Sequence, residues 1–111
     1  MENLLLKELA GQIAMNLSGG NKRKLCVAMA LVASPKLCFL DEPSTGLDPI
    51  ASDQLWKVIK AYSAQINTAF ILSTHWMHEA ENFCHSIAIL VQGKLVTAGS
   101  PDYLKAKYDQ E

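Results

Sequence analysis

Several features that would direct the interpretation elsewhere are missing from this sequence of 111 residues. Its longest apolar runs, such as 69–72, are far shorter than the roughly 20 residues that a membrane-spanning helix needs. The first ten residues mix Glu2, Lys7 and Glu8 with leucines, so they do not resemble a secretory signal. The net charge is −1 and half of the residues are hydrophobic. This balance argues against a basic nucleic-acid-binding domain and against a disordered chain.

Cysteine motifs are missing too. The three cysteines are Cys26, Cys38 and Cys84. They are odd in number and lack C-x-x-C spacing, which fits a reduced cytosolic compartment. A group of possible zinc ligands does occur later in the chain, and it consists of His75, His78, Cys84 and His85. It has no H-E-x-x-H pattern, and the next expected strand already begins at Ser86, so a zinc site is the weaker interpretation.

What the chain does contain is organised around residues 16–48, which begin with a small-residue turn and a helix. Ser18 is a good N-cap, and Gly19 and Gly20 allow close approach of an anion and positive φ. We expect a helix from Asn21 to about Ala33, whose N-terminal amides and dipole favour phosphate. When this turn is taken alone, a capped loop without any ligand is the favoured interpretation.

That helix carries one apolar stripe and one basic cluster. The stripe has helical spacing and consists of Leu25, Ala28, Met29 and Val32, so we expect it to face the core. The basic cluster, 22–24, occupies the first turn. It is either a solvated surface or a positive rim near phosphates or a membrane partner, and the solvated surface is favoured.

A short apolar strand, 37–40, follows and ends in two acids, Asp41 and Glu42. Its uniform apolar character predicts a parallel strand that is covered on both faces. In open α/β sheets, ligands bind at the carboxyl ends of the strands. Two acids there suit phosphoryl transfer, since one holds Mg²⁺ directly or through water and the other polarises the attacking water. A pair of solvated loop acids is the alternative.

The rest of the chain continues the alternation of strand and helix. Asp48 and Pro49 predict the start of a helix that runs to about Gln65. Its inward face is expected to comprise Leu55, Val58, Ile59 and Tyr62, with Trp56 at the edge. A second buried strand is expected over 68–73, followed by His75 at the same sheet edge as the acids, since crossovers between parallel strands are right-handed. A short helix over 77–83, a hairpin of strands 86–91 and 95–98, and a last helix from Pro101 to about Tyr108 complete the prediction.

Four of these motifs, in this order, resemble the nucleotide-binding domain of ATP-binding-cassette (ABC) transporters. The run 17–21 is similar to the family's signature motif, 37–42 to its Walker B strand, 45–48 to its D-loop, and His75 to its H-loop histidine. The resemblance covers about residues 8–108. Asn21 stands where the family usually has Gln, and together with the following basic residues it looks most like subfamily A, whose members largely move lipids.

The resemblance implies a partial P-loop NTPase fold of α/β class, with parallel strands, crossover helices, a C-terminal β-hairpin and a last helix. It implies ATP and Mg²⁺ as cofactors, with Asp41 holding the metal, Glu42 activating water and His75 contacting the γ-phosphate. Ser18, Gly19, Gly20 and Asn21 would clamp the phosphate bound by a second nucleotide-binding domain in a head-to-tail dimer. Asp48 would link the two sites.

The P-loop pattern G-x-x-x-x-G-K-[ST] does not occur in these residues. Without its amide cradle and lysine, we expect residues 1–111 to hold the signature and Walker B half of the domain and to be inactive alone. The expected partners are a second nucleotide-binding domain and the transmembrane domains of a transporter, at the cytosolic face of a membrane. Two alternatives stay open: a non-catalytic module that completes or modulates a partner's site, and part of a soluble cassette ATPase.

Overall fold

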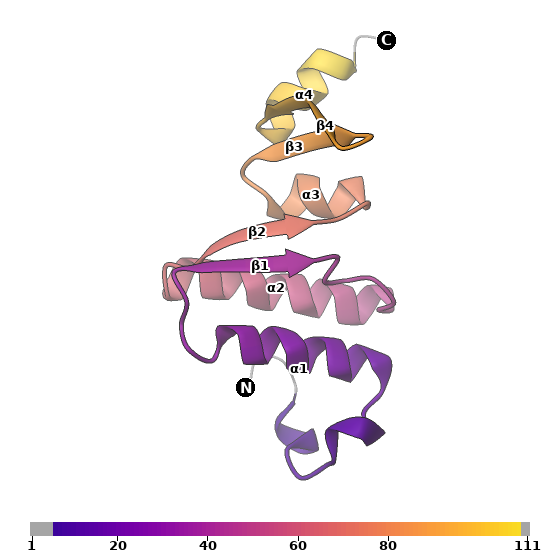
Figure 1. Ribbon diagram of the computed structural model, residues 1–111, viewed down its shortest axis with the longest axis vertical. Helices are drawn as coiled ribbons and strands as arrows, with labels where there is room; N and C mark the ends of the chain where they lie inside the picture. The colour runs from indigo at the N-terminus through magenta and orange to yellow at the C-terminus, as the bar shows by residue number, and fades with distance from the viewer. Residues whose placement is uncertain (1–5, 110–111) are drawn as a thin grey trace. The chain divides into compact units, whose positions relative to one another are not determined.

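The computed structural model describes residues 6–109, and the chain divides into two compact units, one ending at Ser73 and one beginning at Thr74 (Figure 1). Within residues 6–109, the first unit contains two 3-10 turns, two helices and two strands. The second unit contains two helices and a two-stranded hairpin. The main elements are α1 (Gly19–Leu31), β1 (Leu37–Asp41), α2 (Pro49–Gln65), β2 (Ala69–Ser73), α3 (Met77–Phe83), β3 (Ile87–Val91), β4 (Lys94–Gly99) and α4 (Pro101–Tyr108).

In the first unit, β1 and β2 pair in parallel, and α2 forms the crossover between them. The register runs from Leu37 opposite Ala69 to Asp41 opposite Ser73, so both strands end at the same edge. Figure 1 shows both arrowheads, the first turn of α1 and the first turn of α2 on one side of this unit. Chain direction therefore gathers the ends of both strands and the starts of both helices at one edge.

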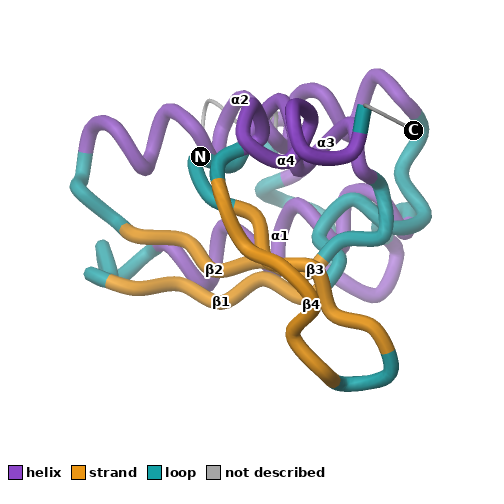
Figure 2. Tube along the Cα trace, turned by 90° about the horizontal axis from the view of Figure 1, so that it is seen from above, coloured by secondary structure: helices purple, strands orange, loops and turns teal. Residues whose placement is uncertain are grey.

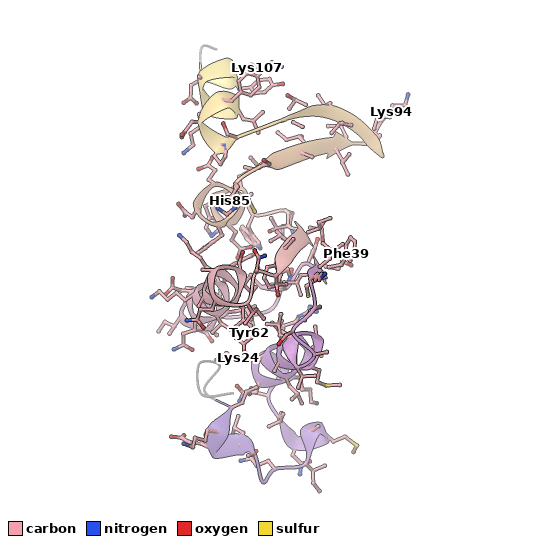
Figure 3. All side chains as sticks on the ribbon, turned by 90° about the vertical axis from the view of Figure 1, so that its left-hand side faces the viewer. Lys24, Phe39, Tyr62, His85, Lys94 and Lys107 are labelled. Carbon is pink, nitrogen blue, oxygen red and sulfur yellow. The ribbon has the colours of Figure 1, made fainter. Side chains whose placement is uncertain are left out.

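Only one face of this strand pair is covered within the described residues. Along β1, buried and exposed side chains alternate, with Cys38 and Leu40 buried. On the opposite face, Leu37, Phe39 and Ile71 are exposed, Phe39 by 68%. Figure 3 shows Phe39 on the side of the strand away from α2. The expectation of strands covered on both faces was wrong for these residues, because α2 packs on a single face (Figure 2).

The packing face of α1 also differs from the predicted stripe. Its buried residues are Lys24, Val27 and Leu31, whereas Met29 is 66% and Val32 82% exposed. The helix has apolar residues on nearly every side and almost no amphipathic character, so spacing alone selected the wrong face. The helix also begins at Gly19 and ends at Leu31, about two residues before the predicted bounds.

The α2 helix supplies the core of the first unit. It begins and ends at the predicted residues, with Leu55, Val58 and Ile59 buried and Tyr62 half-buried. Trp56 is 1% exposed, so the prediction that it lies at the edge of the face was wrong. An aromatic ring of this size contributes much of the apolar area that stabilises a small unit.

The second unit follows the predicted order. The strands β3 and β4 form an antiparallel hairpin, and Gln92 and Gly93, both with positive φ, make its two-residue turn. Positive φ at both positions is the geometry that matches the twist of hairpin strands. The α4 helix is capped by Ser100, whose Oγ accepts from the Tyr103 amide at 3.2 Å. Within residues 6–109, no helix has the length and apolar character needed to cross a bilayer.

Candidate functional site

The predicted acids lie at the shared carboxyl edge of β1 and β2. Asp41 is the last residue of β1, is exposed, and accepts a short hydrogen bond from the Ser73 hydroxyl at the end of β2. The Glu42 amide donates to the Ser73 carbonyl and to the Ser73 Oγ, each at 3.1 Å. Ser73 thus connects both acids to β2. Neither acid is enclosed by apolar side chains, since Asp41 is exposed and Glu42 half-buried.

The backbone turns sharply at Glu42. Its φ is +43°, a left-handed conformation that is uncommon for residues other than glycine and that concentrates at functional sites. The side chain is held as well, because the Thr45 Oγ1 donates to its Oε2 at 3.0 Å. Behind it, Pro43 and Ser44 are buried. The Glu42 carboxylate is therefore fixed by its own loop at the edge of the sheet.

The glycine turn adjoins this loop. Ser18 caps α1 as predicted, with its Oγ accepting from the Asn21 amide at 3.2 Å. Gly19 and Gly20 are the first helical residues and are not among those with positive φ, so this turn does not use the positive φ that glycine allows. A Cβ on Gly20 would lie 3.2 Å from Leu47 Cδ2, whereas a Cβ on Gly19 would meet no atom within 4 Å. Leu47 therefore packs close to the glycine turn at Gly20, while Gly19 faces open space.

The basic cluster is not a uniform solvated surface. Lys22 is exposed and Arg23 half-buried, but Lys24 is only 7% exposed. The Lys24 Nζ donates to the Gln54 Oε1 at 3.2 Å. Since Gln54 lies on α2, this bond joins α1 to α2, the helix that follows the D-loop-like segment 45–48. Lys24 is labelled in Figure 3.

Asp48 has the structural role that the sequence predicts. Its Oδ1 accepts from the amides of Ile50 and Ala51, both at 3.0 Å, and Pro49 follows as the first helical residue. The residue is nevertheless exposed, at the same edge as the acids. Capping of α2 thus occupies one carboxylate oxygen of Asp48.

A cavity of about 190 Å³ lies between α1 and β1, and its lining includes Arg23, Phe39 and Asp41. Pockets that enclose small ligands are usually about 300–1,000 Å³. This cavity is too small to enclose a nucleoside triphosphate.

His75 belongs to the second unit, in the turn before α3, and is exposed. Its ring stacks at a tilt on Trp76, with centroids 5.0 Å apart. The Thr74 Oγ1 accepts from the Trp76 amide at 3.1 Å and donates to the Glu79 Oε2 at 3.0 Å. Glu79 is 4% exposed. His75 is therefore carried by a turn that a buried carboxylate holds.

The possible zinc ligands are not gathered in the structure. Among the side chains of residues 6–109, no group of three or more histidine, cysteine or acidic residues is placed to hold a metal ion. Burial, and secondarily the charge of Glu79, raises the pKa of the Cys84 thiol, and burial raises the pKa of Cys38. Both thiols thus favour the protonated form, which is a poor metal ligand.

Comparison with known proteins identifies this arrangement. The family model for ABC transporters matches residues 1–45. Over 106 residues the chain is 48% identical to ABC transporter A family member 4 of Arabidopsis thaliana. Over 108 residues it is 44% identical to the human phospholipid-transporting ATPase ABCA3. These likenesses place the chain with the ABC transporters of subfamily A. The two alignments cover 96% and 97% of this chain but 11% and 6% of the relatives, so the chain spans about a tenth or less of each.

The fold gives the same assignment. CbiO1 of Clostridium perfringens, part of the ABC transporter complex CbiONQ, superposes with a TM-score of 0.84 at 25% identity. The superposition covers 98% of this chain and 43% of the CbiO1 chain. The predicted fold class is therefore confirmed: the chain has part of the α/β fold of an ABC ATPase. It is a nucleotide-binding-domain segment of the subfamily A type.

Sequence reasoning missed several residues that shape this ABC-type site. Ser73 reads in the sequence only as the end of a strand, and its place beside Asp41 follows from the register of the two strands. Thr45 is part of the D-loop-like motif 45–48, and nothing in that motif indicates its bond to Glu42. The contact between Gly20 and Leu47 joins residues far apart in sequence, and no local pattern indicates it.

Proposed function

We propose that this chain supplies a metal-binding acid, a water-activating acid and the signature turn, residues 18–20, of an ATP-hydrolysing cassette that powers transport. The observation that carries the proposal is the shared edge at which Ser73 holds Asp41 and Glu42 together, next to a loop that packs against the glycine turn. This edge combines acids for metal and water with a helix N-terminus for phosphate, which are among the parts that phosphoryl transfer uses.

The two acids take different roles. Asp41 holds Mg²⁺, directly or through water, and its exposed carboxylate beside the Ser73 hydroxyl offers oxygen ligands of the kind that Mg²⁺ prefers. When bound, the metal neutralises charge on the phosphates. Glu42 orients or deprotonates the attacking water. Its positive φ and its bond from Thr45 support this role, since both fix a carboxylate that would otherwise be mobile.

The signature turn acts on a second copy of the site. The first amides of a helix lack carbonyl partners within the helix, so those of α1 suit a phosphate that is presented by another domain. Gly19, with open space where a side chain would be, leaves room for that approach. Ser18, Gly19, Gly20 and Asn21 thus clamp phosphate on the partner nucleotide-binding domain. Asp48 connects the two sites, and His75 contacts the γ-phosphate.

In its full context this cassette works with transmembrane domains at the cytosolic face of a membrane. The human relative ABCA3 is named a phospholipid-transporting ATPase, which favours a lipid as the transported substrate. Residues 1–111 on their own are expected to lack ATPase activity, since their sequence has no P-loop to hold the β- and γ-phosphates.

The test is ATP turnover in a protein that carries residues 1–111 together with a P-loop and transmembrane domains, here called the full-length protein. Glu42→Gln is the main variant. Loss of a general base costs about 100-fold or more in kcat, so turnover should fall by at least that factor while ATP binding persists. Asp53→Asn is the matched control, because this exposed carboxylate pairs with Lys57 on the outer side of α2 and should leave turnover unchanged.

Two outcomes would favour other functions. If the full-length protein binds a second nucleotide-binding domain and changes its turnover, and Glu42→Gln has no effect, the chain is a non-catalytic module. If it hydrolyses ATP without any membrane component, it belongs to a soluble cassette ATPase. In a separate assay, turnover by residues 1–111 alone that Glu42→Gln abolishes would refute the expected inactivity.

A further inference from the structure

The second unit contains a buried carboxylate for which the proposed chemistry has no use. Glu79 lies in α3, is 4% exposed, and its Oε2 accepts from the Thr74 Oγ1 at 3.0 Å. Burying a carboxylate is unfavourable unless hydrogen bonds compensate for the lost water. The hydrogen-bond partner of this buried acceptor therefore indicates what Glu79 holds in place.

Glu79 holds the turn that carries His75. The Thr74 hydroxyl donates to Glu79 and accepts from the Trp76 amide at 3.1 Å. The Glu79 amide in turn donates to the Trp76 carbonyl at 3.1 Å. The residues on both sides of His75 are therefore tied to Glu79, Thr74 to its carboxylate and Trp76 to its backbone amide.

The imidazole of His75 lies beside the Trp76 ring in this turn. His75 is exposed and its ring lies 5.0 Å from the Trp76 ring, centroid to centroid, at 36°. The Trp76 ring also meets His78 edge-on at 5.9 Å. The backbone of the turn sets where the His75 side chain starts, and the Thr74 hydroxyl links that backbone to Glu79 through its bonds with the Trp76 amide and the Glu79 carboxylate.

We propose that Glu79 is a positioning residue for His75, acting through the Thr74 hydroxyl on the turn between β2 and α3. The proposal rests on the proposed function, in which His75 contacts the γ-phosphate. Hydrogen bonds to charged groups are the stronger ones and add geometric specificity. Small misplacement of a catalytic group can lower a rate by about 100-fold, so a fixed turn serves kcat more than nucleotide affinity.

The experiment compares five variants in the full-length protein. Thr74→Val removes the hydroxyl with little change in shape, and Thr74→Ser restores it. Glu79→Ala removes the acceptor, and Glu79→Gln keeps an oxygen that can accept. Glu81→Gln is the matched control on the same helix, because Glu81 is partly exposed and pairs with Lys105 at 3.1 Å.

We expect Thr74→Val and Glu79→Ala to lower kcat by about 10- to 100-fold, with the KM for ATP changed less than about threefold. Thr74→Ser and Glu79→Gln should stay within about threefold of the parent, and Glu81→Gln should match it. The NMR signals of the His75 imidazole, recorded without nucleotide, should shift in the first two variants and stay in place in the control. If Glu79→Ala does not fold, Thr74→Val decides.

The outcomes separate the inference from the function on which it rests. If His75→Ala lowers kcat but Thr74→Val leaves both kcat and the His75 signals unchanged, the positioning role is wrong. A lower melting temperature with unmoved His75 signals would show that the network only stabilises the unit, and would also overturn the proposal. If His75→Ala itself leaves kcat unchanged, the catalytic role of His75 fails, while the imidazole signals still decide whether Glu79 positions it.

Discussion

Two valines on α1 offer a direct test of which face of the signature helix packs against the core. Val27 is 3% exposed, whereas Val32, at the C-cap of the same helix, is 82% exposed. The apolar spacing of the sequence places Val32 on the core face, and the structure places Val27 there. Replacing each by alanine removes the same two methyl groups, so any difference in the free energy of unfolding reports on packing.

The expected magnitudes follow from burial. Two buried methyl groups are worth about 1.6 kcal/mol, and an unfilled cavity adds to this, while the higher helix propensity of alanine returns about 0.5 kcal/mol. Val27→Ala should therefore lower the free energy of unfolding by about 1.5–2 kcal/mol. Val32→Ala should change it by less than about 0.5 kcal/mol, because its side chain is already in water.

Urea unfolding of residues 1–111 measures both effects. Trp56, 1% exposed on α2, reports on the first unit, and a Trp76→Phe background leaves it as the sole tryptophan. With an m-value of about 1 kcal/mol per M, Val27→Ala should lower the midpoint by about 1.5–2 M relative to that background. If Val32→Ala shifts the midpoint as much as Val27→Ala does, the packing face of α1 has been assigned wrongly.

Three further predictions concern the two units. Gly19→Ala should raise the free energy of unfolding by up to about 1 kcal/mol, because alanine favours the helix. Gly20→Ala should raise it less, because the added methyl group would meet Leu47. Thermal melts of the two variants compare these effects. Asp48→Ala should cost about 1 kcal/mol through loss of the α2 cap, and Asp48→Asn should recover most of it in the same melts. Because burial raises the pKa of Cys84, its contribution to stability is complete below the ordinary value of 9.0 and is lost as the pH rises through the higher folded value. Unfolding midpoints should therefore fall above about pH 9 in the parent and fall less in Cys84→Ala.

Local patterns predicted most of the elements because their signals act over a few residues. Caps by Ser18, Asp48 and Ser100 each appear as predicted, since a side-chain oxygen satisfies amides only one turn away. The bounds of α2 and α3 agree residue for residue with the prediction. The hairpin turn at 92–93 was indicated by its glycine.

The candidate site was predictable only in its composition. The sequence named the two acids, the glycine turn and His75, and their functional roles stay proposals. The bonds that fix them were not predicted: Ser73 to both acids, Thr45 to Glu42, and Thr74 to Glu79. The Ser73 bonds depend on the register of β1 and β2, and the other two depend on how the loop after β1 and the turn before α3 fold, which residue identity alone does not encode.

The sequence by itself determined the order of strands and helices, the helix caps and the motifs that place the chain with the ABC transporters, because these depend on short-range chemistry and residue identity. Only the tertiary structure decided which face of α1 is buried, that Lys24 is bonded to Gln54 rather than solvated, and that Phe39 faces outward. The physical reason is that burial depends on which surfaces pack together. A helix that is apolar on nearly every side, or a strand that is apolar throughout, leaves that choice to its neighbours.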